Sequence, residues 1–303
     1  MTKVALTIAG LDPSGGAGII ADIKTFSAFG CFATAAVSSL TFQNTVGVFG
    51  TVNQTAESVR GQVEPVLRDF TVSALKTGML PTREVIEEVA RLVRENNLQN
   101  FVVDPVVRST SGFDLIDDAA LRALIEKLFP LSSVITPNIA EAERIARIKI
   151  ENVFDIRRAA RIMQNFGARA VLIKGGHLPF AGAEYESSSA ELTSEARSPK
   201  NEEQKIEGQK TKDEKRKAID FMFIGEQEFT FSADFIETDA THGTGCTFAA
   251  AITANLANEK TLPEAVETAK RFVTEAIRSA PDLGHGHSPV NHSIANFGLP
   301  TAN

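Results

Sequence analysis

The chain has 303 residues, a formal net charge of −7 and two cysteines far apart in the sequence. The acidic balance offers no basic surface for nucleic acid, and the cysteine count excludes a disulfide framework and a cysteine-rich zinc site. No apolar run approaches the ~18 residues that a membrane span requires, and the first ten residues are too short an apolar run for a signal peptide. We therefore expect a cytoplasmic protein that binds neither membranes nor nucleic acids.

Short apolar runs alternate with amphipathic patterns from the N-terminus to residue 176. The expected strands cover residues 4–9, 32–40, 46–52, 74–80, 101–107, 134–138 and 170–176. The expected helices cover residues 19–29, 55–70, 81–93, 121–128, 140–147 and 156–166. Strands that are apolar throughout and alternate with such helices predict a mostly parallel sheet covered on both faces by helices.

Residues 181–217 interrupt this pattern. They are rich in Ser, Glu and Lys and poor in large apolar side chains, so they cannot bury enough surface to become ordered. We predict a flexible surface insertion within a single domain that spans residues 1–303. A hairpin is expected next, with strands at residues 221–224 and 229–231 and a turn at 225–228, followed by helices at residues 247–256 and 263–279.

The sequence Asp239–Ala251 (D-A-T-H-G-T-G-C-T-F-A-A-A) predicts a glycine turn that leads directly into an apolar helix. Gly243, Thr244 and Gly245 can point successive backbone N–H groups into one small space, where the positive end of the helix dipole favours an anion. Cys246 follows at the same helix end, where we expect a lowered thiol pKa. Taken alone, the pattern also fits an ordinary turn with a small buried cysteine.

Polar residues and glycines occur at or just beyond the ends of several expected strands, where parallel sheets bind their ligands. These positions are Gln43, Gly78, Asp104, Asn138 and Lys174. Asp104 ends a buried strand and needs a partner for its charge. That partner could be Mg²⁺ with phosphate ligands, or the backbone N–H groups of the Asp-Pro turn.

Asn138 and Glu141 begin an expected helix one turn apart, so both can face one spot, although the same pattern also predicts a capping box. Lys174 precedes two glycines at the end of a strand. Its ammonium group can reach across the sheet edge toward a triphosphate, or extend into solvent.

The Gln43 amide can donate and accept hydrogen bonds, which suits the edge of a ring that carries both kinds of group. A plain turn residue is the alternative. His242, His285, His287 and His292 lack the cysteine or H-E-x-x-H companions of a zinc site, so we expect them to be structural or to line a substrate site.

A series of motifs, in order along the chain, resembles the hydroxymethylpyrimidine/phosphomethylpyrimidine kinases of thiamine biosynthesis, which belong to the ribokinase superfamily. The motifs are T-I-A-G-L-D-P-S-G-G-A-G-I-I-A-D-I-K-T, F-Q-N-T, K-T-G-M-L, V-V-D-P-V, I-T-P-N-I-A-E-A, V-L-I-K-G-G-H and T-H-G-T-G-C-T. The resemblance covers nearly the whole chain except residues 181–217. It implies a ribokinase-like three-layer α/β/α fold with a mostly parallel central sheet, and a homodimer.

The resemblance also implies an activity and a set of site residues. The activity is ATP- and Mg²⁺-dependent phosphorylation of 4-amino-5-hydroxymethyl-2-methylpyrimidine, and then of its monophosphate to the diphosphate. Cys246 would be the catalytic base, where sugar-kinase relatives have aspartate, and Gly243, Thr244 and Gly245 would form the anion hole. The implied contacts are Gln43, Gly10, Met79, Asp22 and Val106 for the pyrimidine, Lys174, Asn138 and Thr244 for ATP, and Asp104 and Glu141 for Mg²⁺.

Three other functions fit parts of the same pattern. A vitamin B6 kinase acting on pyridoxal or pyridoxine would share the fold and the cysteine corner, and Gln43 favours the aminopyrimidine over that substrate. A non-catalytic sensor of the pyrimidine would be expected to lack Cys246, Lys174 or Asp104, and all three are present. A sugar kinase would be expected to have aspartate at position 246.

Overall fold

The computed structural model describes residues 2–107, 115–176 and 216–294. These residues form one nine-stranded sheet in the order β3-β2-β1-β4-β5-β6-β7-β8-β9. The strands are β1 (Val4–Leu11), β2 (Phe32–Gln43), β3 (Val48–Asn53), β4 (Val72–Thr77), β5 (Phe101–Val103), β6 (Val134–Ile135), β7 (Ala170–Lys174), β8 (Lys217–Ile224) and β9 (Gln227–Asp234). The six strands from β2 to β7 in this order are parallel, whereas β3, β8 and β9 pair antiparallel at the two edges.

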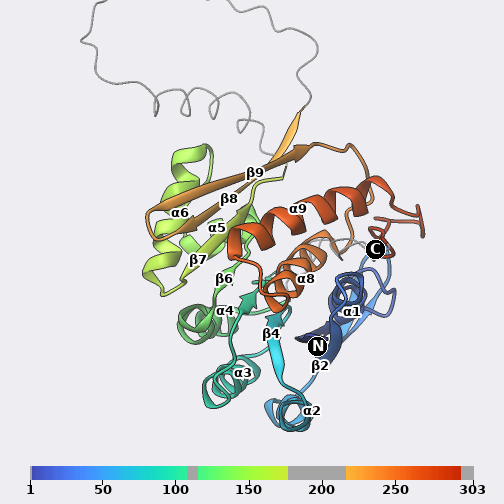
Figure 1. Ribbon diagram of the computed structural model, residues 1–303, viewed down its shortest axis with the longest axis vertical. Coiled ribbons are helices and arrows are strands. Elements are labelled where there is room, and N and C mark those ends of the chain that lie inside the picture. Colours follow the sequence, from blue (N-terminus) through green and yellow to red (C-terminus); the bar gives the residue numbers. More distant parts are fainter. Residues whose placement is uncertain (1, 108–114, 177–215, 295–303) are drawn as a thin grey trace, which may run out of the picture.

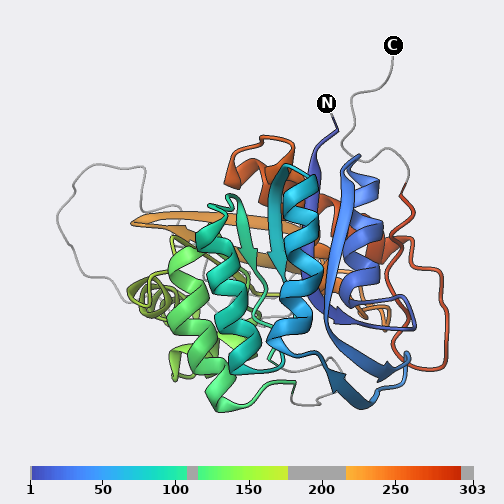
Figure 2. The same cartoon turned by 90° about the horizontal axis from the view of Figure 1, so that it is seen from below.

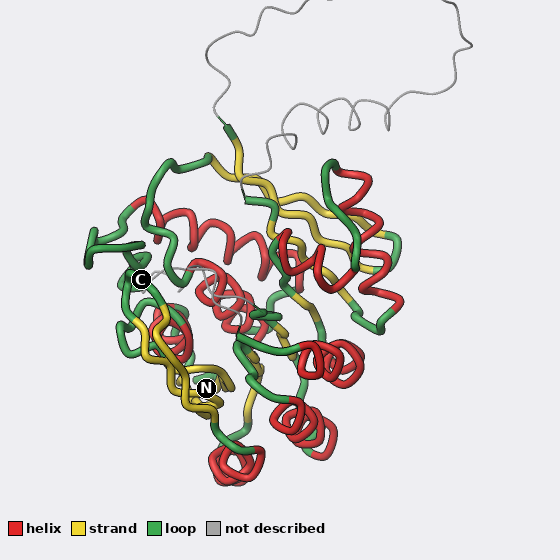
Figure 3. Tube along the Cα trace, turned by 180° about the vertical axis from the view of Figure 1, so that it is seen from behind, coloured by secondary structure: helices red, strands yellow, loops and turns green. Residues whose placement is uncertain are grey.

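Two helix layers enclose the sheet (Figures 1 and 2). One layer contains α1 (Gly18–Ala28), α8 (Thr244–Ala257) and α9 (Leu262–Arg278). The other contains α2 (Ala56–Asp69), α3 (Arg83–Glu95), α4 (Asp118–Ala123), α5 (Ile139–Ala146) and α6 (Val153–Asn165). Figure 3 shows the same arrangement from behind, with the strands between the helices. The predicted three-layer, mostly parallel architecture is therefore confirmed.

Successive residues of the central strands pack into different layers. In β1, Leu6 and Ile8 belong to the core beneath α2 to α6, whereas Ala5 belongs to the core beneath α1, α8 and α9. This alternation follows from the pleat of a β-strand, which points neighbouring side chains to opposite faces. Both faces are buried, so an apolar side chain is favoured at every position, and the continuous apolar runs in the sequence have this cause.

Several predicted boundaries were wrong by a few residues. Ile224 pairs with Gln227, so the hairpin turn holds only Gly225 and Glu226, and Gly225 has a φ of 56°. Gln227 and Glu228 were assigned to the turn because they are polar, but they are strand residues at an exposed edge. The glycine-turn helix begins at Thr244, earlier than predicted.

The predicted flexible insertion at residues 181–217 is only partly within the described ranges. Lys217, its last residue, begins β8, and residues 181–215 lie outside the described residues. Within the described ranges, no helix is both long enough and apolar enough to cross a membrane.

Candidate active site

A cavity of about 170 Å³ opens where the carboxyl ends of the parallel strands meet the first turn of α8. A second cavity of about 540 Å³ lies beside it, between α8, α9 and the β8–β9 hairpin. The two cavities share Asn138, Lys174 and Gly245. The structure therefore places two adjoining cavities at the predicted glycine corner.

Most residues predicted from the sequence lie at this place. The first cavity is lined by Gly10, Gln43, Met79, Asp104, Val106, Asn138, Glu141, Lys174, Gly243, Gly245 and Cys246. Thr244 lines the second cavity, together with Asn138 and Lys174. Segments distant in sequence converge here because the strand tips of a parallel sheet share one edge.

The glycine corner is held in place by close contact with the loop after β1. Gly243 has a φ of 79°, and a Cβ atom added there would lie 1.9 Å from the Gly16 carbonyl oxygen. Only glycine combines this backbone conformation with so close an approach. A Cβ atom at Gly245 would lie 3.3 Å from Lys174 Nζ, so the ammonium group faces the first turn of α8. Backbone N–H groups and a positive charge thus converge on one space suited to an anion.

The prediction of a lowered Cys246 pKa was wrong. Burial raises the pKa of the Cys246 thiol to about 11, and the negative charges of Asp22 and Asp104 act in the same direction. The charge of Lys76 and a backbone hydrogen bond at Gly18 oppose this shift without cancelling it. The helix end does favour a thiolate, but here enclosure by the protein outweighs it. Cys246 is therefore mainly a neutral thiol at pH 7 in this structure.

Lys174 and Asp104 form an ion pair between the two cavities. Lys174 Nζ lies 3.0 Å from Asp104 Oδ1, which also accepts a hydrogen bond of 2.9 Å from Thr136 Oγ1. Burial alone would lower the pKa of Lys174, but Asp104 and Glu141 raise it, so the ammonium group stays charged. Asp104 has the partner that its burial requires.

Asn138 and Glu141 form the capping box that the sequence also allowed. Asn138 Oδ1 accepts a hydrogen bond of 2.9 Å from the Glu141 N–H, and Glu141 Oε2 accepts one of 2.8 Å from the Asn138 N–H. Both residues nevertheless line the first cavity, so the cap and a ligand contact do not exclude one another. Burial raises the pKa of Glu141 to about 7, against the opposing charge of Lys174.

The acidic residues fit a metal ion that phosphates help to bind. No group of three or more His, Cys, Asp and Glu side chains suited to a metal occurs in the described part of the chain. Asp104 and Glu141 are two carboxylates at the wall of one cavity. Mg²⁺ is commonly held by one or two carboxylates with substrate phosphates completing its octahedron. The donor set therefore suits Mg²⁺ that enters with a nucleotide.

The residues implied for the pyrimidine differ in their positions. A Cβ atom at Gly10 would lie 3.1 Å from Met79 Sδ. Glycine at this position therefore keeps the space beside the Met79 side chain open. Asp22 is not at the cavity wall, contrary to its assignment: it is fully buried and bonded to Lys76 and Thr7. A carboxylate so enclosed needs a counter-charge, and Lys76 of the K-T-G-M-L motif supplies it.

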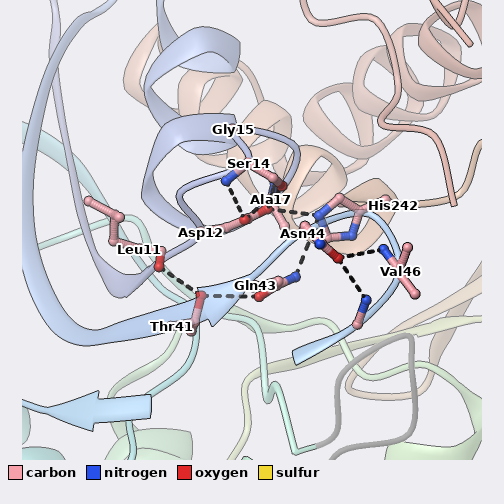
Figure 4. A network of polar contacts seen from close by, with 12 residues as sticks. Leu11, Asp12, Ser14, Gly15, Ala17, Thr41, Gln43, Asn44, Val46 and His242 are labelled. Atoms are coloured by element: carbon pink, nitrogen blue, oxygen red, sulfur yellow. Dashed lines mark hydrogen bonds and ion pairs between the residues drawn. The ribbon is translucent and has the colours of Figure 1, made fainter. Parts of the chain in front are cut away.

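Two further residues belong to the site. His242, assigned only as structural or substrate-lining, lines the first cavity, and its Nε2 lies 2.7 Å from Oδ2 of Asp12, which was not predicted at all (Figure 4). Asp12 also accepts hydrogen bonds from the Ser14 and Ala17 N–H groups at 2.8 Å and 2.9 Å. Both residues lie inside motifs noted in the sequence, close to the glycines of those motifs. This closeness along the chain is the sequence feature that could have identified them as site residues.

Comparisons with known proteins agree with this geometry. The model of the phosphomethylpyrimidine kinase family matches residues 12–207 and 201–291. The chain is 38% identical over 288 residues to hydroxymethylpyrimidine/phosphomethylpyrimidine kinase of Bacillus subtilis, covering 95% of this chain and 94% of that protein. It is 39% identical over 291 residues to the protein of the same name from Haemophilus influenzae, covering 96% of each.

Solved structures show the same likeness. The ADP complex of Bacillus subtilis pyridoxal kinase matches with a TM-score of 0.78 and 33% identity, covering 97% of this chain and 98% of that chain. Phosphomethylpyrimidine kinase from Clostridium difficile matches with a TM-score of 0.70 and 35% identity, covering 91% of this chain and all of that one (100%). The fold is ribokinase-like, and the chain belongs to the phosphomethylpyrimidine kinase family.

Proposed function

We propose that this protein transfers the γ-phosphoryl group of ATP to 4-amino-5-hydroxymethyl-2-methylpyrimidine, and then to the monophosphate of that alcohol, in thiamine biosynthesis. The observation that carries the proposal is the convergence of Cys246, Gly245 and Lys174 between two adjoining cavities. The smaller cavity would hold the pyrimidine and the larger one the nucleotide. Names of the relatives support the same activity.

In phosphoryl transfer, the main tasks of the protein residues are to position the two substrates and to neutralise negative charge. The hydroxymethyl oxygen attacks the γ-phosphorus while the bond from phosphorus to the leaving ADP oxygen breaks. The N–H groups of the first turn of α8 and the Lys174 ammonium group stabilise the negative charge that spreads over the phosphoryl oxygens. The hydroxyl proton passes to the Cys246 sulfur, which accepts it only as a thiolate.

Asp104 and Glu141 would hold Mg²⁺, which when bound neutralises charge on the ATP phosphates. Lys174 separates these carboxylates from the glycine corner, since it contacts Asp104 and faces Gly245. This arrangement supports transfer between the two cavities, because Lys174 lines both of them.

A second candidate is a vitamin B6 kinase. Solved structures similar to this one include pyridoxal kinases, one of them from Staphylococcus aureus in complex with pyridoxal at a TM-score of 0.79 and 30% identity. The fold of that structure, which this chain resembles, therefore holds a pyridoxal ring. Gln43 at the wall of the smaller cavity favours the aminopyrimidine.

We further propose a homodimer in the cytoplasm. β2, β3 and the loop between them expose large apolar side chains that a second copy would cover. They are Phe32, Phe42, Val46, Phe49 and Val52, each between 48% and 69% exposed. Phe49→Asp is expected to convert the dimer to a monomer in analytical ultracentrifugation, and an unchanged sedimentation coefficient for a dimeric parent would reject this interface.

The test of the activity is an assay coupled to ADP formation, with Mg²⁺ and ATP present. The hydroxymethylpyrimidine, its monophosphate, pyridoxal and ribose are offered in parallel. Turnover of the first two, with pyridoxal much slower, is the expected result. Preference for pyridoxal would assign the protein to vitamin B6 salvage, and tight pyrimidine binding without turnover would indicate a sensor.

A further inference from the structure

The loop between β1 and α1, residues 12–17, packs directly against the glycine corner that begins α8. His242 Nε2 lies 2.7 Å from Asp12 Oδ2, although 230 positions separate the two residues in the chain (Figure 4). A Cβ atom at Gly243 would lie 1.9 Å from the Gly16 carbonyl oxygen, and one at Gly16 would lie 2.4 Å from His242 Cδ2. The two segments therefore fit together in one tight relative position.

Asp12 organises the β1–α1 loop and also joins it to His242. Its Oδ1 accepts a hydrogen bond of 2.8 Å from the Ser14 N–H, and its Oδ2 accepts one of 2.9 Å from the Ala17 N–H. Burial would raise the pKa of Asp12, but the hydrogen bonds from His242 and Ser14 outweigh burial and lower the pKa, so the carboxylate is ionised. An ionised carboxylate only accepts hydrogen bonds, so His242 Nε2 donates its hydrogen to Asp12.

The β1–α1 loop leads to Gly18, whose backbone N–H contacts Cys246. Ala17 is the N-cap of α1 and Gly18 is the first residue of that helix, where N–H groups have no partner within the helix. The Gly18 N–H donates a hydrogen bond to Cys246 Sγ. Gly18 has a φ of 56°, and a Cβ atom there would lie 2.2 Å from the Gly10 carbonyl oxygen. The proton acceptor of the proposed reaction is therefore bonded to the end of the loop that Asp12 holds.

This hydrogen bond differs in kind from the other effects on the sulfur. The charge of Lys76 on β4 favours a thiolate, whereas Asp22 on α1 and Asp104 after β5 oppose it. These charges act through space. The Gly18 N–H acts by direct contact, and a hydrogen bond to an ionised acceptor is stronger than one to a neutral acceptor. Its contribution to the thiolate therefore depends on where the β1–α1 loop lies.

We propose that the Asp12–His242 pair is a latch that holds the β1–α1 loop against the glycine corner, so that the Gly18 N–H orients Cys246 Sγ and stabilises its thiolate. Asp12 and His242 are thus positioning residues, because they act through Gly18. The side chains are buried, at 3% and 5% exposed, so water does not compete freely for their contact. The inference rests on the proposed function, since it concerns the proton acceptor of that reaction.

The test measures the reactivity of Cys246 in the absence of substrates. In a Cys31→Ala background Cys246 is the one remaining cysteine, and its rate of alkylation by iodoacetamide between about pH 7 and 9 follows the thiolate. Asp12→Asn and His242→Leu should each slow alkylation by about tenfold or more across this range, because a hydrogen bond to the thiolate is weakened. His242→Gln keeps an N–H donor and should stay within about threefold of the parent rate.

A double variant distinguishes a latch from two independent effects. Asp12→Asn/His242→Leu should react no more slowly than either single variant, because each substitution breaks the same contact. His285→Leu changes an exposed histidine and should keep the parent rate.

Three results would overturn the inference. They are a parent-like alkylation rate in either folded single variant, effects that multiply in the double variant, and a His242→Gln protein as slow as His242→Leu. The proposed function fails separately if the parent phosphorylates neither the hydroxymethylpyrimidine nor its monophosphate in the coupled assay.

Discussion

Lys76 Nζ lies 2.8 Å from both carboxylate oxygens of Asp22, and neither side chain is exposed to solvent. The pair joins β4 to α1, and Thr7 Oγ1 donates a further hydrogen bond of 2.7 Å to Asp22. A Cβ atom at Gly78 would lie 3.2 Å from Lys76 Nζ, so the ammonium group lies directly beneath a glycine of the cavity wall. The candidate active site therefore lies over a buried ion pair whose two charges depend on each other.

Removing one partner of this pair is expected to be more harmful than removing both. Lys76→Met should lower the free energy of unfolding by about 3–5 kcal/mol, because it leaves the Asp22 charge buried and unpaired. The double variant Asp22→Asn/Lys76→Met should be clearly more stable than Lys76→Met alone. Urea unfolding measures both. Arg68→Met, which removes the exposed Arg68–Glu64 pair, is the control and should change stability by less than about 1 kcal/mol.

The rate of phosphoryl transfer is expected to rise with pH if the Cys246 thiolate accepts the proton. The Cys246 pKa of about 11 leaves only a small thiolate fraction at neutral pH. That fraction grows about tenfold per pH unit below the pKa, so kcat/KM should rise steeply between about pH 7 and 9. Cys246→Ala should lose at least about a hundredfold in kcat and lose this slope, with pyrimidine binding retained. Cys31→Ala is the control, and the same slope in Cys246→Ala would assign the proton to another group.

Substitution of Gly243 by alanine should damage both folding and turnover. The new methyl group would meet the Gly16 carbonyl oxygen at 1.9 Å, and the φ of 79° is strained for alanine. The free energy of unfolding should fall by at least about 2 kcal/mol. Gly61→Ala is the matched control, since nothing lies within 4 Å of its Cβ position in α2 and alanine should raise stability slightly. Equal thermal stability of the two variants would refute this reason for glycine at the corner.

Lys174→Met should weaken the use of ATP more than the binding of the pyrimidine. Among the described residues, Lys174 is the only charged group that both forms an ion pair with Asp104 and faces Gly245, and the variant removes it. We expect kcat/KM for ATP to fall by about a hundredfold or more, with calorimetric pyrimidine affinity nearly unchanged. Lys149→Met alters an exposed lysine and should leave both values at the parent level. A loss confined to pyrimidine affinity would contradict the assignment.

His292 should make the protein less stable as the pH falls. Thr247 Oγ1 donates to the Gly243 carbonyl oxygen, so His292 Nε2 donates to Thr247 at 2.9 Å. Burial, with the positive charges of Lys24 and His242, lowers the pKa of His292 from 6.5 to about 4. Between these values the unfolded chain binds the proton and the folded protein does not, so acid favours unfolding.

The His292→Gln variant separates the contribution of His292 to the pH dependence of stability from that of the other titrating groups. Between pH 6.5 and pH 4 the parent should lose about 3 kcal/mol more stability than His292→Gln. Urea unfolding at a series of pH values gives the difference. His285→Gln, at an exposed histidine, should follow the parent, and parallel curves for the parent and His292→Gln would refute the assigned pKa shift.

The sequence by itself determined the layered fold and the location of the site. Apolar runs such as residues 101–103 could only be strands buried on both faces, and such strands need a helix layer on each side. Because the strands are parallel, their carboxyl ends share one edge of the sheet. Gln43, Asp104 and Lys174 could therefore be assigned to one place before any coordinate was known, because local pattern and sheet direction were sufficient.

Only the tertiary structure decided how these residues behave. The Cys246 pKa depends on how deeply the thiol is enclosed and on the charges of Asp22 and Asp104, which come from other segments. Asp22, likewise, is buried beside a lysine on another element, and His242 is bonded to Asp12, a residue 230 positions earlier in the chain. These properties depend on burial and on distances between segments far apart in the chain, which residue spacing along the sequence does not specify.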